Sequence, residues 1–253
     1  MRTMGRLDLG SRDGKAPGGY NYPLYETGPP FIFMNAVGTT SDVITMVHEG
    51  GHAVHSFLTH PLPITGFKNF PSEVAELASM SMELLTMEHW HLIYTDPEEL
   101  RRAKRDQLER VLSILPWVAT VDAFQHAIYT HPEWTIKERS KAWVEIHQRF
   151  GGDVVDWSGL DKVRATLWHK QLHIFEGPFY YIEYAVAQLG AIGVWRNYKK
   201  NPTEALHMYT DALKLGYTRT LPEIYAKAGI SFDLSVSNVH ELITFVREEL
   251  DRL

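Results

Sequence analysis

The sequence predicts a mainly α-helical fold with a small β element near the N-terminus. Helix-start signals recur along the chain, whereas Phe31–Met34 is a short apolar segment bounded by proline and glycine, which is typical of a strand. The 253 residues, 44% of them hydrophobic, are enough to bury a full core. We therefore expect residues 1–253 to form a single domain, with residues 1–16 disordered.

Several helices are expected beyond residue 95. Asp96-Pro97 starts the first of them, and Pro116 is expected to kink or break it. A capping box, Thr135-Ile136-Lys137-Glu138, starts the second. The expected ranges are 96–117, 135–151, 201–216 and 233–250. No repeat or long linker interrupts this pattern, so the chain is expected to be helical from here to its end.

Another helix, expected over residues 41–58, carries the pentapeptide His48-Glu49-Gly50-Gly51-His52. Its two histidines lie one turn apart, so both rings can reach one ion, and the glutamate between them is placed as the general base of a zinc hydrolase. Gly50 and Gly51 each weaken the helix by about 1 kcal/mol relative to alanine. We expect substrate or another backbone to approach there. The alternative is an ordinary amphipathic helix with two surface histidines.

A catalytic zinc ion usually has three protein ligands, so a third ligand is expected downstream. The chain has no cysteine, and Leu58 stands where a metzincin would have its third histidine. Glu73 and Glu76 share the face of a second helix, and either can supply the ligand. Glu76 has apolar neighbours, which disfavour an unpaired carboxylate. Glu83 lies two turns further on that face and is expected to orient a ligand histidine.

Four aromatic side chains that each carry a polar group lie within residues 173–184: His173, Tyr180, Tyr181 and Tyr184. Phenol and imidazole groups near a metal can donate hydrogen bonds to the oxyanion that forms in peptide hydrolysis. Packing of these rings in the core is an equal alternative on the residues alone. His169, one turn before His173, is a lesser candidate.

Three blocks of sequence together resemble the catalytic half of the thimet oligopeptidase / oligoendopeptidase F family of zinc metallopeptidases. The similarity runs over most of residues 17–250. Its blocks are Pro30–Asn35 followed by His48–Ser56, then Phe70–Ser79, then His173–Ala185. The resemblance implies a zincin-like catalytic lobe that hydrolyses short peptides.

By this resemblance, the chain binds one zinc ion through His48, His52 and Glu76, with Glu49 as the general base. Glu73 then becomes a neighbour of the metal rather than a ligand. The resemblance also implies that Phe31–Met34 is an edge strand that binds extended substrate; a buried strand without substrate contact is the alternative.

The resemblance assigns substrate-facing roles in the third block. His173 and Tyr184 are implied to contact the peptide. Tyr180 and Tyr181 compete for one further role, because the loop before them varies in length.

The composition sets the expected partners and location. A net charge of −6 argues against nucleic acid as a principal partner. Ala185–Trp195, the most apolar stretch, is too short to cross a membrane, so no membrane partner is expected. Met1–Lys15 has no apolar run and predicts no signal peptide, and we expect a cytoplasmic protein.

The chain is about half as long as usual members of the family, whose N-terminal helical half forms the opposite wall of a substrate channel. Either the chain is a partial product, or a partner chain or a second copy supplies that wall. Two other functions remain open: hydrolysis of a non-peptide amide, and a catalytically impaired remnant acting as a metal-containing binding module. Glu49 argues against the remnant, since metal binding alone does not need it.

We expect the metal site to be intact and the selection of substrates by size to be altered. The isolated chain should then cleave casein as well as a quenched short peptide. Parallel assays of both substrates test this, and strict exclusion of casein would count against it.

Overall fold

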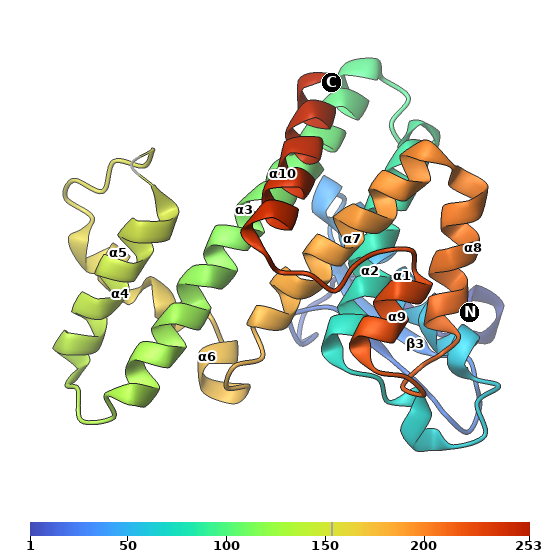
Figure 1. Cartoon of the computed structure of the whole chain (residues 1–253), viewed down its shortest axis with the longest axis horizontal. Helices are drawn as coiled ribbons and strands as arrows, with labels where there is room; N and C mark the ends of the chain where they lie inside the picture. Colours follow the sequence, from blue (N-terminus) through green and yellow to red (C-terminus); the bar gives the residue numbers. More distant parts are fainter. Residues whose placement is uncertain (153) are drawn as a thin grey trace. The chain divides into compact units, whose positions relative to one another are not determined.

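The chain is mainly helical, as predicted, with a small sheet near its N-terminus (Figure 1). A computed structural model describes residues 1–152 and 154–253. The chain divides into two compact units. The first unit combines residues 1–109 with residues 186–253, and the second comprises residues 110–185. Each unit has its own buried core. That residues 1–253 form a single domain remains a prediction.

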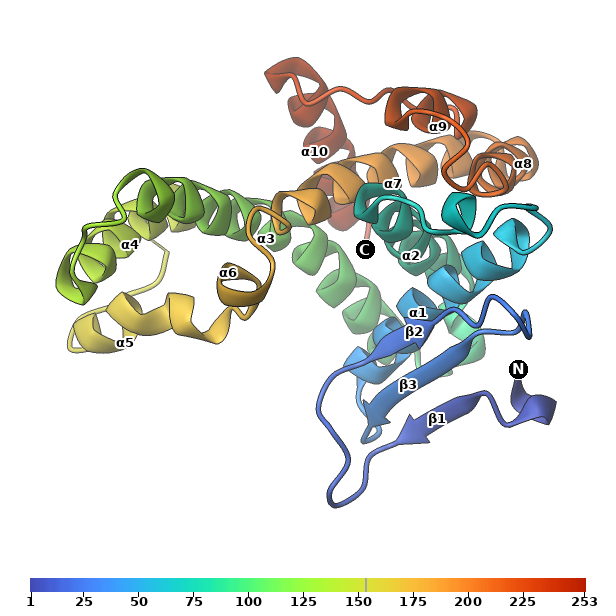
Figure 2. The ribbon, with the colours of Figure 1, turned by 90° about the horizontal axis from the view of Figure 1, so that it is seen from below.

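A three-stranded sheet opens the first unit. Its strands are β1 (Leu7–Gly10), β2 (Tyr20–Tyr22) and β3 (Phe31–Ala36). The order is β1-β3-β2, with β1 parallel and β2 antiparallel to β3, as Figure 2 shows. The strand expected at residues 31–34 is confirmed, but its expected position at an edge is wrong. Because β3 pairs on both sides, the open edges of the sheet belong to β1 and β2.

The first 16 residues contain regular structure, unlike our expectation of disorder. A 3-10 turn, Arg2–Met4, precedes β1, and the backbone of β1 pairs with β3. Strand β1 has four residues, of which Leu7 and Leu9 are apolar, and an alternation this short is a weak strand signal, which explains why the sequence pattern missed it.

Lys15 anchors the loop between β1 and β2. Its side chain is 1% exposed, and its Nζ donates to the carbonyl oxygens of Asp8, Gly10 and Met34 and to the Asp8 carboxylate. Asn35 adds two hydrogen bonds from its side-chain amide to the carbonyls of Ala16 (2.8 Å) and Gly18 (3.0 Å). These bonds fasten the loop to β1 and to the end of β3, and thereby fix where β2 begins.

Two packed helices follow the sheet. Helix α1 (Thr40–Thr59) begins with a capping box in which Asp42 accepts hydrogen bonds from the backbone N–H groups of Val37, Gly38 and Thr39. These bonds hold the pKa of Asp42 below its usual value. Helix α1 packs against β2 and β3 on one side and against helix α2 (Ser72–Thr86) on another.

The two backbones come into contact at Gly51. A Cβ atom at Gly51 would lie 2.6 Å from the Cα of Ser79 and 2.7 Å from the carbonyl oxygen of Ala78, whereas a Cβ at Gly50 would meet nothing within 4 Å. The expectation that another backbone approaches the glycine pair is therefore confirmed for Gly51.

The rest of the first unit is helical. It contains the short 3-10 helices η2 and η3, the first part of α3, most of α7, and the helices α8, α9 and α10. Their bounds are Thr65–Lys68, Met87–Leu92, Pro97–Thr130, Ile182–Lys200, Pro202–Leu213, Leu221–Lys227 and Val236–Asp251. A core of fully buried side chains joins α2 to α7, α8 and α9; it includes Val74, Leu77, Tyr209, Leu213 and Ile224. This core holds α2 in place, and Leu58 of α1 also packs against it.

The last helix begins later than predicted. Asp233 accepts a hydrogen bond from the backbone N–H of Ser235, and the Ser235 hydroxyl in turn accepts from the N–H of Asn238. Ser235 is therefore the N-cap, and helix α10 starts at Val236.

The second unit is built on the end of α3. It also contains α4 (Ile136–Gly151), α5 (Asp161–Thr166), the 3-10 helix η4 (Leu167–Lys170) and α6 (His173–Glu176). The predicted capping box at Thr135 is confirmed, and Gly152 ends α4. The predicted break at Pro116 is wrong, because α3 continues to Thr130. Its later turns are held by packing of the fully buried Val118, Val121 and Phe124 around Trp143.

Helix α3 is also long and apolar enough to cross a membrane, judged by length and composition alone. Of its apolar 18-residue stretch, 33% is buried. A core helix of a soluble protein has the same features. In the later turns of α3, the buried apolar side chains Val118, Val121 and Phe124 lie in the cluster around Trp143.

The glycine pair gives a matched test of the packing between α1 and α2. Gly51→Ala should lower the free energy of unfolding by about 1–3 kcal/mol, because a methyl group there overlaps the backbone of α2. Gly50→Ala has room and should raise it by up to about 1 kcal/mol through helix propensity. Urea unfolding of both variants measures the difference. Equal effects would contradict the close approach.

Lys15 gives a second test. Lys15→Met should lower the free energy of unfolding by about 2–3 kcal/mol, because three carbonyl groups, two of them partly buried, lose a charged donor. It should also speed hydrogen exchange in residues 16–22. Arg12→Met is the control, since the Arg12 side chain is exposed and donates to the carboxylate of Asp8, not to the carbonyl groups that Lys15 binds. If both variants exchange like the wild type, Lys15 does not hold the loop.

Candidate metal centre

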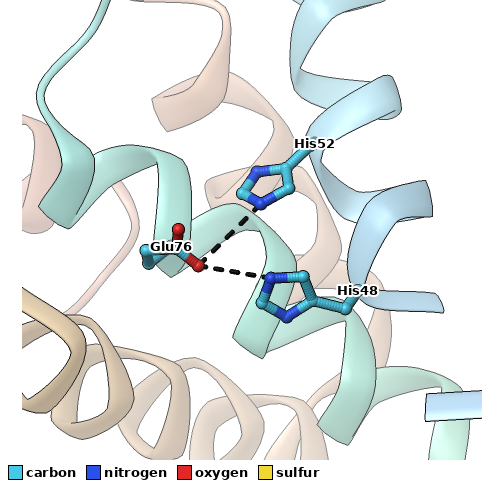
Figure 3. Close-up of side chains that lie close together, drawn as sticks. All are labelled: His48, His52 and Glu76. Atoms are coloured by element: carbon cyan, nitrogen blue, oxygen red, sulfur yellow. Dashed lines mark ion pairs between the residues drawn. The ribbon is translucent and has the colours of Figure 1, made fainter. Parts of the chain in front are cut away.

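Three side chains from α1 and α2 converge on one point, as Figure 3 shows. Oε2 of Glu76 lies 3.3 Å from Nε2 of His48 and 3.8 Å from Nε2 of His52. One ligand atom from each residue lies within 4.8 Å of the others. Among the described residues, no other group of three His, Asp or Glu side chains meets this criterion. Of the predicted candidates, Glu76 joins the histidines, whereas Glu73 does not.

These distances between ligand atoms suit an ion with tetrahedral coordination. Ligand atoms at about 2.0–2.1 Å from zinc lie about 3.4 Å apart, close to the two distances to Glu76. Two imidazoles and one carboxylate form a ligand set that zinc hydrolases use. The group therefore has the chemistry and the dimensions to hold such an ion with a position left for solvent.

Hydrogen bonds orient both histidine rings. Glu83, two turns after Glu76 on α2, accepts a hydrogen bond from Nδ1 of His48 at 2.6 Å, which leaves Nε2 of His48 to face Glu76. The predicted orienting role of Glu83 toward a histidine is thus confirmed. Gln107 on α3 donates to the other oxygen of Glu83 at 2.7 Å. The ring of His52 is held by the backbone carbonyl of Ala75.

The electrostatics of this group favour a bound positive charge. Burial lowers the pKa of His48, but its hydrogen bonds with Glu76 and Glu83 outweigh burial and raise this pKa to about 10. Burial lowers the pKa of His52 to about 4. Burial would raise the pKa of Glu76, but the two histidines hold it below its usual value. Without a metal, the group thus keeps one proton on His48, and a cation can take the place of that charge.

Glu49 lies beside the group and is nearly buried, with 6% of its surface exposed. Burial raises its pKa to about 7, against the opposing effect of His48. The backbone N–H of Asn21 in β2 donates to its carboxylate. Its Oε2 has no hydrogen-bond partner within the described part of the chain. A carboxyl group with this pKa and an oxygen without a hydrogen-bond partner can accept a proton from a water molecule and return it.

The loop anchored by Lys15 brings the backbone of β2 to this carboxylate. A Cβ atom at Gly19 would lie 3.6 Å from Oε1 of Glu49 and 3.2 Å from Cγ2 of Thr45. Because glycine has no side chain, the space between the backbone at position 19 and the side chains of Thr45 and Glu49 stays unfilled. Gly19, Lys15 and Gln107 were not identified from the sequence.

A sequence signal existed for Gln107 alone. It shares a buried stripe with Ala103, Leu108 and Val111 on an otherwise charged helix. A polar residue in such a stripe needs a partner.

His173 and the three tyrosines lie together in the second unit. The ring of His173 has its centroid 5.7 Å from that of Tyr180, 5.0 Å from Tyr181 and 5.6 Å from Tyr184. Tyr181 is buried and belongs to the core around Trp143, whereas Tyr180 and Tyr184 are partly exposed. His169 is exposed and packs on Trp168. Packing in the core, one of the two alternatives, is thus confirmed for Tyr181, and the hydrogen bonds expected from the other rings to a substrate remain a prediction.

Comparison with known proteins identifies the family. Residues 2–237 match peptidase family M3. Oligopeptidase PepF of Bacillus subtilis (strain 168) is 25% identical over 251 residues, which are 98% of this chain and 37% of that protein. The plasmid-encoded oligoendopeptidase F of Lactococcus lactis subsp. cremoris is 25% identical over 268 residues, 98% of this chain and 41% of that protein.

The fold has a close counterpart among solved structures. PZ peptidase A, solved with an inhibitor, matches with a TM-score of 0.92 and 31% identity over 100% of this chain and 45% of that chain. The chain spans about two fifths of the length of the curated relatives that it matches. The predicted resemblance and fold class are confirmed, and the chain belongs to peptidase family M3.

Proposed function

We propose that the chain is a zinc-dependent endopeptidase that hydrolyses short peptides. The convergence of His48, His52 and Glu76 with Glu49 beside them carries this proposal. Membership of a peptidase family supports the reaction type, and the names oligopeptidase and oligoendopeptidase of the relatives support short peptides as substrates.

His48, His52 and Glu76 would hold one zinc ion per chain. The bound ion would act as a Lewis acid that polarises the scissile carbonyl and lowers the pKa of bound water. Glu83 and the Ala75 carbonyl keep the two imidazole rings turned toward that position.

Glu49 acts as the general base. Its unpaired Oε2 takes a proton from the attacking water, and the carboxyl group then gives the proton to the leaving amine. A pKa of about 7 suits both steps, because the group can gain and lose a proton near neutral pH.

The open edge of β2 binds the extended peptide. Strand β2 has only β3 as a sheet neighbour, and its Asn21 backbone contacts Glu49, so a peptide paired with β2 would pass beside the base. This role was expected for the segment that became β3, whose two sides are already paired.

His173 and Tyr184 donate hydrogen bonds to the substrate, in line with their expected role. Tyr180 fills the remaining role rather than Tyr181, because Tyr181 is 7% exposed and packs in the core. Donors of this kind stabilise the developing oxyanion by several kcal/mol.

The wall of the substrate channel would come from outside these 253 residues: from the rest of a longer chain, from a second copy or from a partner chain. This proposal rests on the share of each relative, 37% and 41%, that the chain covers. We also propose that the protein works in the cytoplasm.

Matched glutamate variants separate metal binding from catalysis. Glu76→Gln should lower zinc content well below one ion per chain and abolish hydrolysis, because a charged ligand is lost. Glu49→Gln should keep the zinc and lower kcat by about 10²–10⁴-fold. Glu73→Gln, on the same helix but outside the ligand group, is the control and should change neither property.

Metal analysis of the purified proteins and hydrolysis of a quenched peptide provide the two measurements. Unchanged hydrolysis in Glu49→Gln would remove Glu49 from its role. Stoichiometric zinc without hydrolysis in the wild type would favour a binding module instead of an enzyme.

A further inference from the structure

A chain of hydrogen bonds leads from the core of the second unit to His173. The indole Nε1–H of Trp117 donates to Oε1 of Gln171 at 3.1 Å. Nε2 of Gln171 lies 2.7 Å from Nδ1 of His173, and Nε2 of His173 lies 3.3 Å from the hydroxyl of Tyr184. Trp117 lies on α3, and Gln171 connects η4 to α6.

The indole group fixes which way the Gln171 amide faces. An indole N–H can only donate, so the amide atom that faces it must be the carbonyl oxygen. The reverse orientation would place the amide NH₂ against the indole N–H, two donors in contact. The indole N–H also approaches the hydroxyl of Tyr181, which is a further acceptor and leaves this assignment unchanged.

The amide in turn fixes the tautomer of His173. Its NH₂ group faces Nδ1 and can only donate, so Nδ1 must accept. In a neutral imidazole the proton then lies on Nε2, on the side of Tyr184.

The backbone of Gln171 is held as firmly as its side chain. Its N–H donates to the carbonyl of Trp168 at 3.2 Å, and its own carbonyl accepts from the N–H of Ile174 at 3.1 Å. The ammonium group of Lys170 also packs over the Trp117 ring, 4.5 Å from its centroid. Gln171 therefore holds its position without help from a substrate.

We propose that Gln171 is a positioning residue that keeps His173 as an Nε2–H hydrogen-bond donor. Trp117 fixes the Gln171 amide, the amide fixes the imidazole, and the imidazole presents its N–H beside the Tyr184 hydroxyl. The benefit for catalysis rests on the proposed peptidase function, in which this N–H donates to a carbonyl oxygen that gains charge.

Nitrogen NMR of the full chain labelled with ¹⁵N-histidine tests the tautomer directly. The His173 signals are identified by their loss in His173→Gln. In the wild type at neutral pH, Nε2 should have the shift of a protonated ring nitrogen and Nδ1 that of an unprotonated one. The opposite assignment in the wild type would overturn the proposal, whatever the activity.

Gln171→Glu should invert the tautomer. One carboxylate oxygen still accepts from Trp117, but the other now requires a proton on Nδ1 of His173. The NMR shifts of the two ring nitrogens should exchange, and kcat should fall by about 10²-fold with little change in KM. Gln148→Glu makes the same change at an exposed position of α4 and should alter neither readout.

The outcomes separate this proposal from the peptidase function. An inverted tautomer with unchanged kcat would overturn the catalytic benefit of Gln171, and an unchanged tautomer in Gln171→Glu would overturn its positioning role. A wild type that shows the expected tautomer but no hydrolysis would instead contradict the proposed function. If Gln171→Glu does not fold, Trp117→Phe replaces it: the freed amide can turn, and both tautomers should then be observed.

Discussion

Two helices can bring three side chains to one point only if their backbones approach closely at the right turn. In this protein the approach occurs at Gly51, where α1 has no side chain and meets the backbone of Ala78 and Ser79 in α2. His48 and His52 flank this contact on α1, and Glu76 lies one turn before it on α2. The Ser79 hydroxyl also donates to the Glu76 carboxylate at 3.0 Å. The contact between the helices therefore sets the distance between the imidazoles and the carboxylate.

The buried charges of the site follow from this close packing. Carboxylates and imidazoles are removed from water together, so each must be matched by a partner of opposite charge or by a hydrogen bond. Glu76 and Glu83 share His48, and Gln107 holds Glu83. Glu49 differs, because one of its oxygens has no partner among the described residues and its pKa is raised to about 7. The packing thus leaves a single carboxylate ready to exchange a proton.

Much of this arrangement could be predicted from local sequence patterns. Helical spacing placed His48 and His52 on one face, and apolar neighbours singled out Glu76 as a carboxylate that needs a partner. The order of the sheet could not be predicted, since β1 and β2 are short and their pairing with β3 depends on the distant anchor Lys15. The helix through Pro116 depends likewise on packing in the second unit. Local signals and the family resemblance together identified the three side chains that converge, whereas long-range contacts decided which strand lies beside Glu49.

The most direct test of the central claim is the position of zinc in a crystal of the zinc-loaded protein, located by anomalous scattering. One peak is expected at about 2.0–2.2 Å from Nε2 of His48, Nε2 of His52 and a carboxylate oxygen of Glu76. Zinc bound at other residues, or no peak at this point at saturating zinc, would contradict it.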